Sequence, residues 1–90
     1  MAKTERQLER IVKGFANHRR IQMMSLLEKQ PELSLEEVSE RLNIGLKTAC
    51  VHLGKMAVAG LVLKRYEGRS VRHKLTRRAE DILTFLRMLE

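Results

Sequence analysis

Hydrophobic residues recur with a helical period in the first third of the chain. Four of them share one helix face through i, i+3, i+4, i+7 spacing: Leu8, Ile11, Val12 and Phe15. This stripe predicts a helix over residues 4–16. A second, broader apolar face predicts a helix over residues 17–29, which ends just before Pro31 because proline disfavours helical geometry in the residue before it.

Two shorter helical segments follow, separated by a three-residue turn. Ser34 and Glu37 have the S-x-x-E spacing of a capping box, which predicts a helix over residues 35–42. The next apolar-periodic segment predicts a helix over residues 46–59. Two short helices joined by a tight turn are typical of a helix-turn-helix motif, here at about residues 34–59.

After residue 60 the hydrophobic period changes from 3.6 to 2. This change predicts two strands, over residues 61–66 and 70–75. Gly68 lies between them and supplies the positive φ that a tight hairpin requires. We therefore expect a β-hairpin, or wing, at about residues 61–75.

A last helix is predicted over residues 76–90, and its apolar face exceeds what one helix needs to dock on a small core. The residues of this surplus are Ile82, Phe85, Leu86 and Leu89. Together with the stripe of the first helix they predict a dimer interface, formed by the helices at about 4–16 and 76–90. The expected fold is mainly α with a small β-hairpin: a single dimeric winged helix-turn-helix domain spanning residues 1–90.

Positive charge is concentrated in the second half of the chain, and the net charge is +7. Residues 1–45 hold eight Lys and Arg against seven Glu (+1), whereas residues 46–90 hold ten against four acids (+6). Residues 64–78 alone hold seven basic residues and one acid. Such a segment is either a solvated basic face or a phosphate-binding surface, and the helix-turn-helix beside it favours the second interpretation.

Several short motifs occur in a fixed order along residues 8–80. They are the second-helix run Phe15-Ala16-Asn17-His18-Arg19-Arg20-Ile21-Gln22-Met23-Met24-Ser25-Leu26-Leu27, the stretch from Leu42-Asn43-Ile44 through Thr48 and His52-Leu53 to Ala59-Gly60-Leu61-Val62, and Glu67-Gly68-Arg69 with Val71 and Leu75. In this order they resemble the ArsR-like family of winged-helix repressors. The resemblance implies a homodimer that binds a pseudo-palindromic double-stranded DNA site, with half-sites about 34–36 Å apart.

The chain departs from that family in two places. Many members bind metal through a Cys-x-Cys pair at the third helix or through Asp and His on the last helix. Here the third helix begins Leu33-Ser34-Leu35, and the last helix has Asp81 without a histidine. We therefore expect no metal and no cofactor. The second departure is the recognition helix, which reads Leu46-Lys47-Thr48-Ala49-Cys50-Val51-His52 where the family usually carries Ser, Gln and Arg.

The candidate DNA contacts lie on the fourth helix and the wing. They are Lys47, Thr48, Val51, His52, Lys64, Arg65, Arg69, Arg72 and Lys74. Arg69, beside the turn glycine, is placed to enter a narrow minor groove. Lys47 can donate to guanine or to phosphate. Leu46 and Val51 either contact thymine methyl groups or pack against a neighbouring helix.

No constellation of catalytic residues is apparent. Cys50 and His52 are two residues apart on a helix and so point about 200° apart, which excludes a catalytic pair. Cys50 is expected to be a small, semi-buried residue. No segment is long and apolar enough to predict a membrane span, and a single cysteine is consistent with the cytoplasm. The alternative to a DNA-binding regulator is a winged-helix protein-interaction module, which would not need the basic wing.

Overall fold

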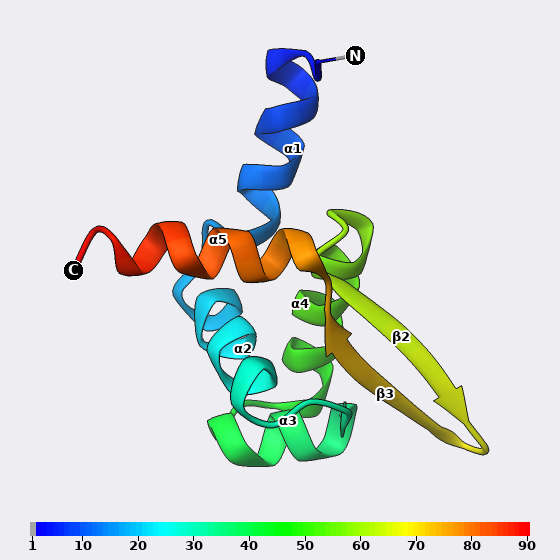
Figure 1. The fold of residues 1–90 in the computed structure, drawn as a ribbon. Helices are drawn as coiled ribbons and strands as arrows, with labels where there is room; N and C mark the ends of the chain where they lie inside the picture. The colour runs from blue at the N-terminus through cyan, green and yellow to red at the C-terminus, as the bar shows by residue number, and fades with distance from the viewer. Residues whose placement is uncertain (1) are drawn as a thin grey trace.

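The helices and the hairpin follow one another as the sequence predicts, with one additional strand (Figure 1). These elements lie within residues 2–90, which the computed structural model describes, so residue 1 of the predicted domain lies outside the described residues. The elements are α1 (Glu5–Phe15), α2 (His18–Lys29), β1 (Leu33–Ser34), α3 (Leu35–Leu42), α4 (Leu46–Val58), β2 (Val62–Glu67), β3 (Ser70–Leu75) and α5 (Arg77–Arg87). The predicted fold class, mainly α with a winged helix-turn-helix, is confirmed.

Polar side chains fix where four of the helices begin. Thr4 and Ser34 form capping boxes, in which the side chain accepts from the third helical backbone N–H and that residue's side chain accepts in return. Asn17 and Thr76 cap α2 and α5 through their side-chain oxygens. The end of α5 was predicted less well: it stops at Arg87, whereas the prediction ran to residue 90.

The sheet has three antiparallel strands in the order β1-β3-β2, of which β1 was not predicted. This two-residue strand pairs Leu33 with His73 and Ser34 with Arg72. Two residues are too few to show a period of two, and the pairing partners lie about 40 residues away. The strand ties the start of α3 to the wing.

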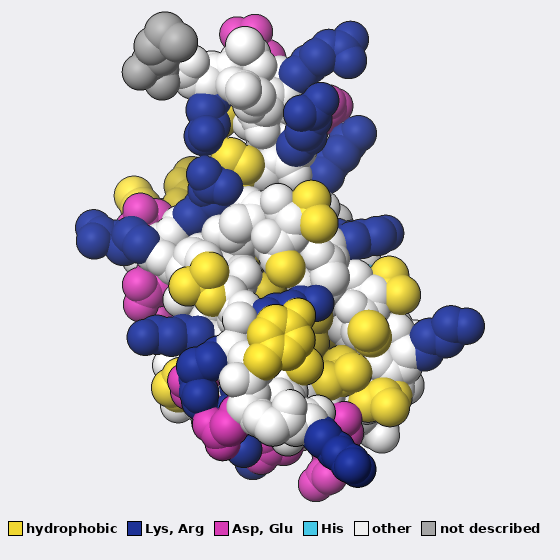
Figure 2. Space-filling view, turned by 90° about the vertical axis from the view of Figure 1, so that its right-hand side faces the viewer, with side chains coloured by type: hydrophobic (Ala, Val, Ile, Leu, Met, Phe, Trp, Pro, Cys, Tyr) yellow, Lys and Arg dark blue, Asp and Glu magenta, His cyan; other side chains and the backbone are white. Residues whose placement is uncertain are grey.

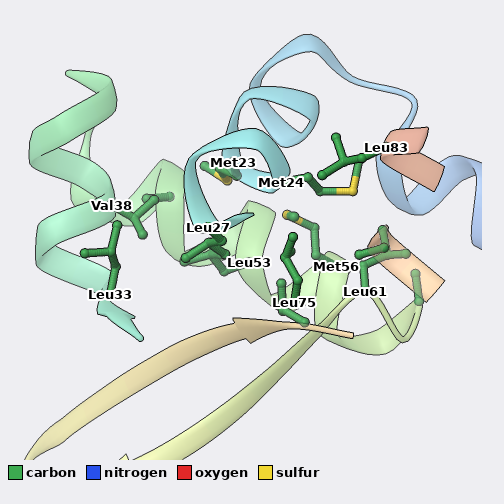
Figure 3. Packing of buried hydrophobic residues seen from close by; sticks show 14 residues of the cluster. Met23, Met24, Leu27, Leu33, Val38, Leu53, Met56, Leu61, Leu75 and Leu83 are labelled. Atoms are coloured by element: carbon green, nitrogen blue, oxygen red, sulfur yellow. The ribbon is translucent and has the colours of Figure 1, made fainter. Parts of the chain in front are cut away.

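The core lies between α2, α3, α4, β3 and α5 (Figure 3). Its largest fully buried side chains are Met23, Met24, Leu27, Val38, Leu53, Met56 and Leu61. α1 reaches this core only at its C-terminal end, where Gly14 lies against the end of α4 so closely that an added Cβ would collide with the Cβ of Ala59. The rest of α1 projects away from the body of the domain (Figure 1).

Apolar side chains on α1 and α5 remain uncovered. Leu8 and Val12 are each 49% exposed, and Phe85 is 55% exposed. A hollow of about 490 Å³ between the two helices is lined by Ile11, Ile82 and other residues of α5. Of the remaining predicted interface residues, Phe15 and Leu86 are half-buried and Leu89 is exposed. The predicted interface residues are thus partly or largely exposed on α1 and α5, with Arg78 and Asp81 beside them at the hollow, and their pairing with a second chain stays a prediction.

Candidate nucleic-acid interface

The turn between α3 and α4 is held by its own hydrogen bonds. Asn43 adopts the left-handed conformation (φ 52°) that ends α3. The Ser39 hydroxyl donates to the Ile44 carbonyl oxygen at 2.6 Å, and the Ile44 backbone N–H donates to the Ser39 carbonyl oxygen at 3.1 Å. These bonds fix the angle at which α4 leaves α3 and therefore the direction in which α4 presents its outer face.

α4 packs against the core through Ala49, Leu53 and Met56, which are all fully or almost fully buried. Because successive residues are rotated by about 100° around a helix, the line opposite this buried face can be read from the numbering. That outer line consists of Lys47, Val51, Gly54 and Val58.

The exposed side chains of α4 are mostly apolar. Leu46 is 50% exposed, Val51 is 51% exposed and Val58 is 92% exposed. Neither Leu46 nor Val51 is buried against a neighbouring helix. The alternative that these two side chains pack against such a helix is therefore not observed. Cys50 is also exposed, and the expectation that it would be semi-buried was wrong, because a hollow between α4 and the wing leaves its side chain uncovered.

His52 faces α2 and is half-buried, unlike the other predicted contacts of α4. Burial lowers the pKa of its imidazole, and the positive charges of Arg20 and Lys55 lower it further. Its Nδ1 atom is buried and makes no hydrogen bond within residues 2–90. The ring is therefore neutral at pH 7 and is directed toward α2, while Lys47 and Thr48 remain exposed.

The wing has two different faces because side chains alternate along its strands. Lys64 pairs with His73 and Tyr66 pairs with Val71, so these four lie on one face. This face looks toward α3 and α4 across a hollow of about 140 Å³, which Lys64 and Arg69 line together with Cys50. His73 itself is buried, its ring Nδ1–H donates to the Leu33 carbonyl oxygen at 3.0 Å, and burial lowers its pKa.

The other face of the wing carries Arg65 and Arg72, which are paired with acidic residues. Arg65 donates to Glu32 at 2.9 Å and to Glu67 at 2.8 Å. The Arg65 guanidinium holds the pKa of the Glu67 carboxyl below its usual range. Arg72 donates to the Glu32 carbonyl oxygen at 3.1 Å and lies 3.5 Å from the Glu37 carboxylate. These bonds join the wing to the start of α3.

The remaining predicted basic residues are exposed and unpaired. Lys47, Lys64, Arg69 and Lys74 make no ion pair within residues 2–90. In the view onto the wing-bearing side, Lys and Arg side chains project from the edges of the body, and hydrophobic side chains lie exposed between them (Figure 2). The structure thus brings Lys64 and Arg69 to the side of the wing that faces α4.

Sequence reasoning missed two features of this surface. Tyr66 is 74% exposed and shares a wing face with Lys64, which strand alternation could have shown. Gly54 lies on the outer line of α4 with no atom within 4 Å of where its Cβ would be. Its place in the middle of a helix was a detectable signal, since an interior glycine costs about 1 kcal/mol relative to alanine.

Among residues 2–90, no three His, Cys, Asp or Glu side chains come together in a way that could hold a metal ion. Nor does this part contain a helix with the length and apolar character to cross a membrane.

Comparison with known proteins finds similarity among solved structures. Neither a protein-family profile nor a curated protein sequence matches the chain. HlyU from Vibrio cholerae is 30% identical, with a TM-score of 0.83 over 99% of this chain and 97% of that chain. A homodimeric winged helix-turn-helix DNA-binding domain from Mycobacterium bovis, described as a possible ArsR-family transcriptional regulator, is 25% identical, with a TM-score of 0.83 over 99% of this chain and 88% of that chain. The transcriptional regulator HlyU from Vibrio vulnificus is 29% identical, with a TM-score of 0.76 over 91% and 85%.

Proposed function

The chain belongs to the ArsR-like family of winged helix-turn-helix transcriptional regulators, and from this premise we propose that it is a homodimeric repressor that binds pseudo-palindromic duplex DNA. The observation that carries the proposal is the set of exposed, unpaired cations on the recognition helix and the wing: Lys47 on α4, and Lys64, Arg69 and Lys74 on the wing. When Lys and Arg side chains bind DNA, they displace the counterions condensed at its phosphates, and the release of these counterions favours binding.

Each part of the surface has a proposed role. The N-terminal half of α4, with Lys47, Thr48 and Val51, enters the major groove. Arg69 at the wing tip enters the adjacent minor groove, and Lys64 and Lys74 bind phosphates. Since Arg65 and Arg72 are hydrogen-bonded within the protein and His52 is half-buried against α2, we propose that the arginines position the wing and that all three make at most peripheral contacts with DNA.

Dimerisation is proposed through the exposed apolar surface of α1 and α5. The DNA-binding domain from Mycobacterium bovis, which has the same fold, is homodimeric. A two-fold axis through this surface would present two copies of α4 to one side of a duplex, about one helical turn apart.

Fluorescence anisotropy tests the proposal directly. The full chain is titrated into labelled duplex DNA from the region upstream of its own gene, and into a scrambled duplex of the same composition, between 50 and 200 mM salt. If the four cations of each protomer all displace counterions from the duplex, the affinity should fall roughly 10⁴-fold over this range. Preference for the upstream duplex with a steep salt dependence supports a specific regulator, and equal binding to both duplexes contradicts it.

One observation favours a second function, a protein-interaction module. Val58 is 92% exposed and Val51 is 51% exposed, so the outer line of α4 is more apolar than phosphate binding needs. Absence of binding to any duplex at 50 mM salt would favour this function over the first.

A further inference from the structure

The outer line of the recognition helix offers few hydrogen-bonding groups that could read a base, and the Thr48 hydroxyl is exposed on its flank. Along Lys47, Val51, Gly54 and Val58, only the lysine has a polar side chain. The histidine that could have supplemented it is turned toward α2, where burial and positive charge keep it neutral. Leu46 and Cys50, on the flank that faces the wing, add apolar surface.

The chemistry of the major groove limits what such a surface can recognise. Each base pair presents hydrogen-bond donors and acceptors there, and thymine alone among the bases also presents an apolar group, its C5-methyl. An apolar side chain packed against the edge of a G·C pair would remove water from donors and acceptors without replacing the missing hydrogen bonds, which is unfavourable. The same side chain against a thymine methyl covers apolar surface on both partners.

We propose that Val51, assisted by Leu46, determines specificity by packing against thymine methyl groups, so that the half-site carries thymine where these side chains face it. This inference rests on the proposed DNA-binding function. Both side chains are half-exposed in the free protein and therefore available, and both stand in the first half of α4, beside Lys47. Lys47 supplies charge and contributes little discrimination, because a flexible ammonium can reach either guanine or phosphate.

Gly54 supports this docking geometry. The bare backbone at this position lies one helical turn beyond Val51 on the same outer line, and nothing within the protein fills the space. A missing side chain at this point allows the wall of the groove to approach the helix closely, which lets Val51 reach the base edges.

Replacement of thymine by deoxyuridine tests the proposal, because it removes the C5-methyl and leaves base pairing intact. The preferred duplex is first selected from a randomised pool with the full chain. Each half-site thymine is then replaced in turn, and the dissociation constant is measured by fluorescence anisotropy at fixed salt. Removal of one buried methyl should weaken binding about fourfold in each half-site, or roughly 15-fold for both.

Two variants give the experiment its controls. Val51→Ala should bind the thymine duplex more weakly and should not distinguish it from the deoxyuridine duplex at the position that Val51 faces. Val58→Ala makes the same change at the far end of the same helix, at a residue that is 92% exposed, and should keep the full discrimination. Since both substitutions lie on an exposed helix face and alanine favours helix, neither should impair folding.

The outcomes separate this inference from the proposed function. Tight, salt-dependent binding that is indifferent to every thymine-to-deoxyuridine replacement would overturn methyl recognition and leave a DNA-binding regulator. Discrimination that persists in Val51→Ala would show that another residue reads the methyl, which also overturns it. If no duplex is selected from the pool, the proposed function itself fails.

Discussion

Two helical glycines, Gly14 and Gly54, lie in opposite surroundings: one is crowded by a neighbouring element and the other has free space around it. At Gly14 an added Cβ would collide with the Cβ of Ala59, so the glycine allows α1 to approach the end of α4. At Gly54 no atom lies within 4 Å of such a Cβ, so nothing inside the protein requires a glycine there. Of the two, Gly54 is therefore the one that is free to serve contact with another molecule.

This contrast leads to opposite predictions for the same substitution. Gly54→Ala should raise the free energy of unfolding by up to about 1 kcal/mol, because alanine is the better helix former. Gly14→Ala should lower it by about 1–3 kcal/mol, since overpacking at a backbone contact outweighs the gain in helix propensity. Urea unfolding followed by circular dichroism measures both changes.

DNA binding provides the second measurement for this pair. Gly54→Ala should weaken binding to the selected duplex while it stabilises the protein. Unchanged affinity in a stabilised Gly54→Ala variant would mean that the groove does not approach this point of α4.

The sequence did not reveal which side chains of α4 are covered by neighbouring elements. Helical periodicity accounts for the inward-facing Ala49, Leu53 and Met56, which have the i, i+4, i+7 spacing of one helix face. It did not indicate that Cys50 is exposed or that His52 turns toward α2, because those outcomes depend on how α2 and the wing lie against α4. Periodicity assigns a residue to a side of its own helix, and neighbouring elements decide what covers that side.

At the scale of elements, the position of the wing depends on bonds between residues far apart in the chain. Arg65 and Arg72 bond to Glu32 and Glu37, which precede them by more than 30 residues. Strand β1 adds backbone pairing in the same region. Sequence patterns predicted the hairpin correctly, but they could not reveal these partners. Arg65 and Arg72 therefore could not be distinguished, from the sequence, from the unpaired cations beside them.

The two kinds of arginine should respond differently to mutation. Arg69→Ala should weaken DNA binding and reduce the slope of log affinity against log salt by about two units per dimer, because each protomer then brings one cation fewer to the duplex and displaces one counterion fewer. Arg72→Ala should weaken binding by loosening the wing and should leave the slope unchanged. Anisotropy titrations at several salt concentrations separate these effects, and a flattened slope in Arg72→Ala would assign that residue to a phosphate.

At the scale of the whole molecule, the monomer leaves apolar side chains of α1 and α5 uncovered. α1 projects from the body of the domain, and Leu8, Val12 and Phe85 are each about half-exposed. A 90-residue domain buries a limited share of its surface, so a second copy offers substantial additional burial. In the proposed complex, the same pairing would place two recognition helices on one duplex and would link the stability of the protein to its affinity for DNA.

Phe85→Glu tests this link. A carboxylate in the centre of an apolar interface loses hydration without gaining a partner, so the variant should run as a 10.5 kDa monomer in light scattering, whereas the wild type runs as a dimer of about twice that mass. Each monomer then binds a single half-site, and affinity for the full site should fall by about 10²–10⁴-fold with the loss of multivalency.

Thr84→Glu is the matched control, because it adds the same charge at the adjacent exposed position, about 100° around α5, and should leave the protein dimeric. Leu8→Glu, on α1, should repeat the effect of Phe85→Glu if the two helices form one interface. Persistence of the dimer in both variants would place the interface elsewhere, and the spacing between the two copies of α4 would then no longer follow from α1 and α5.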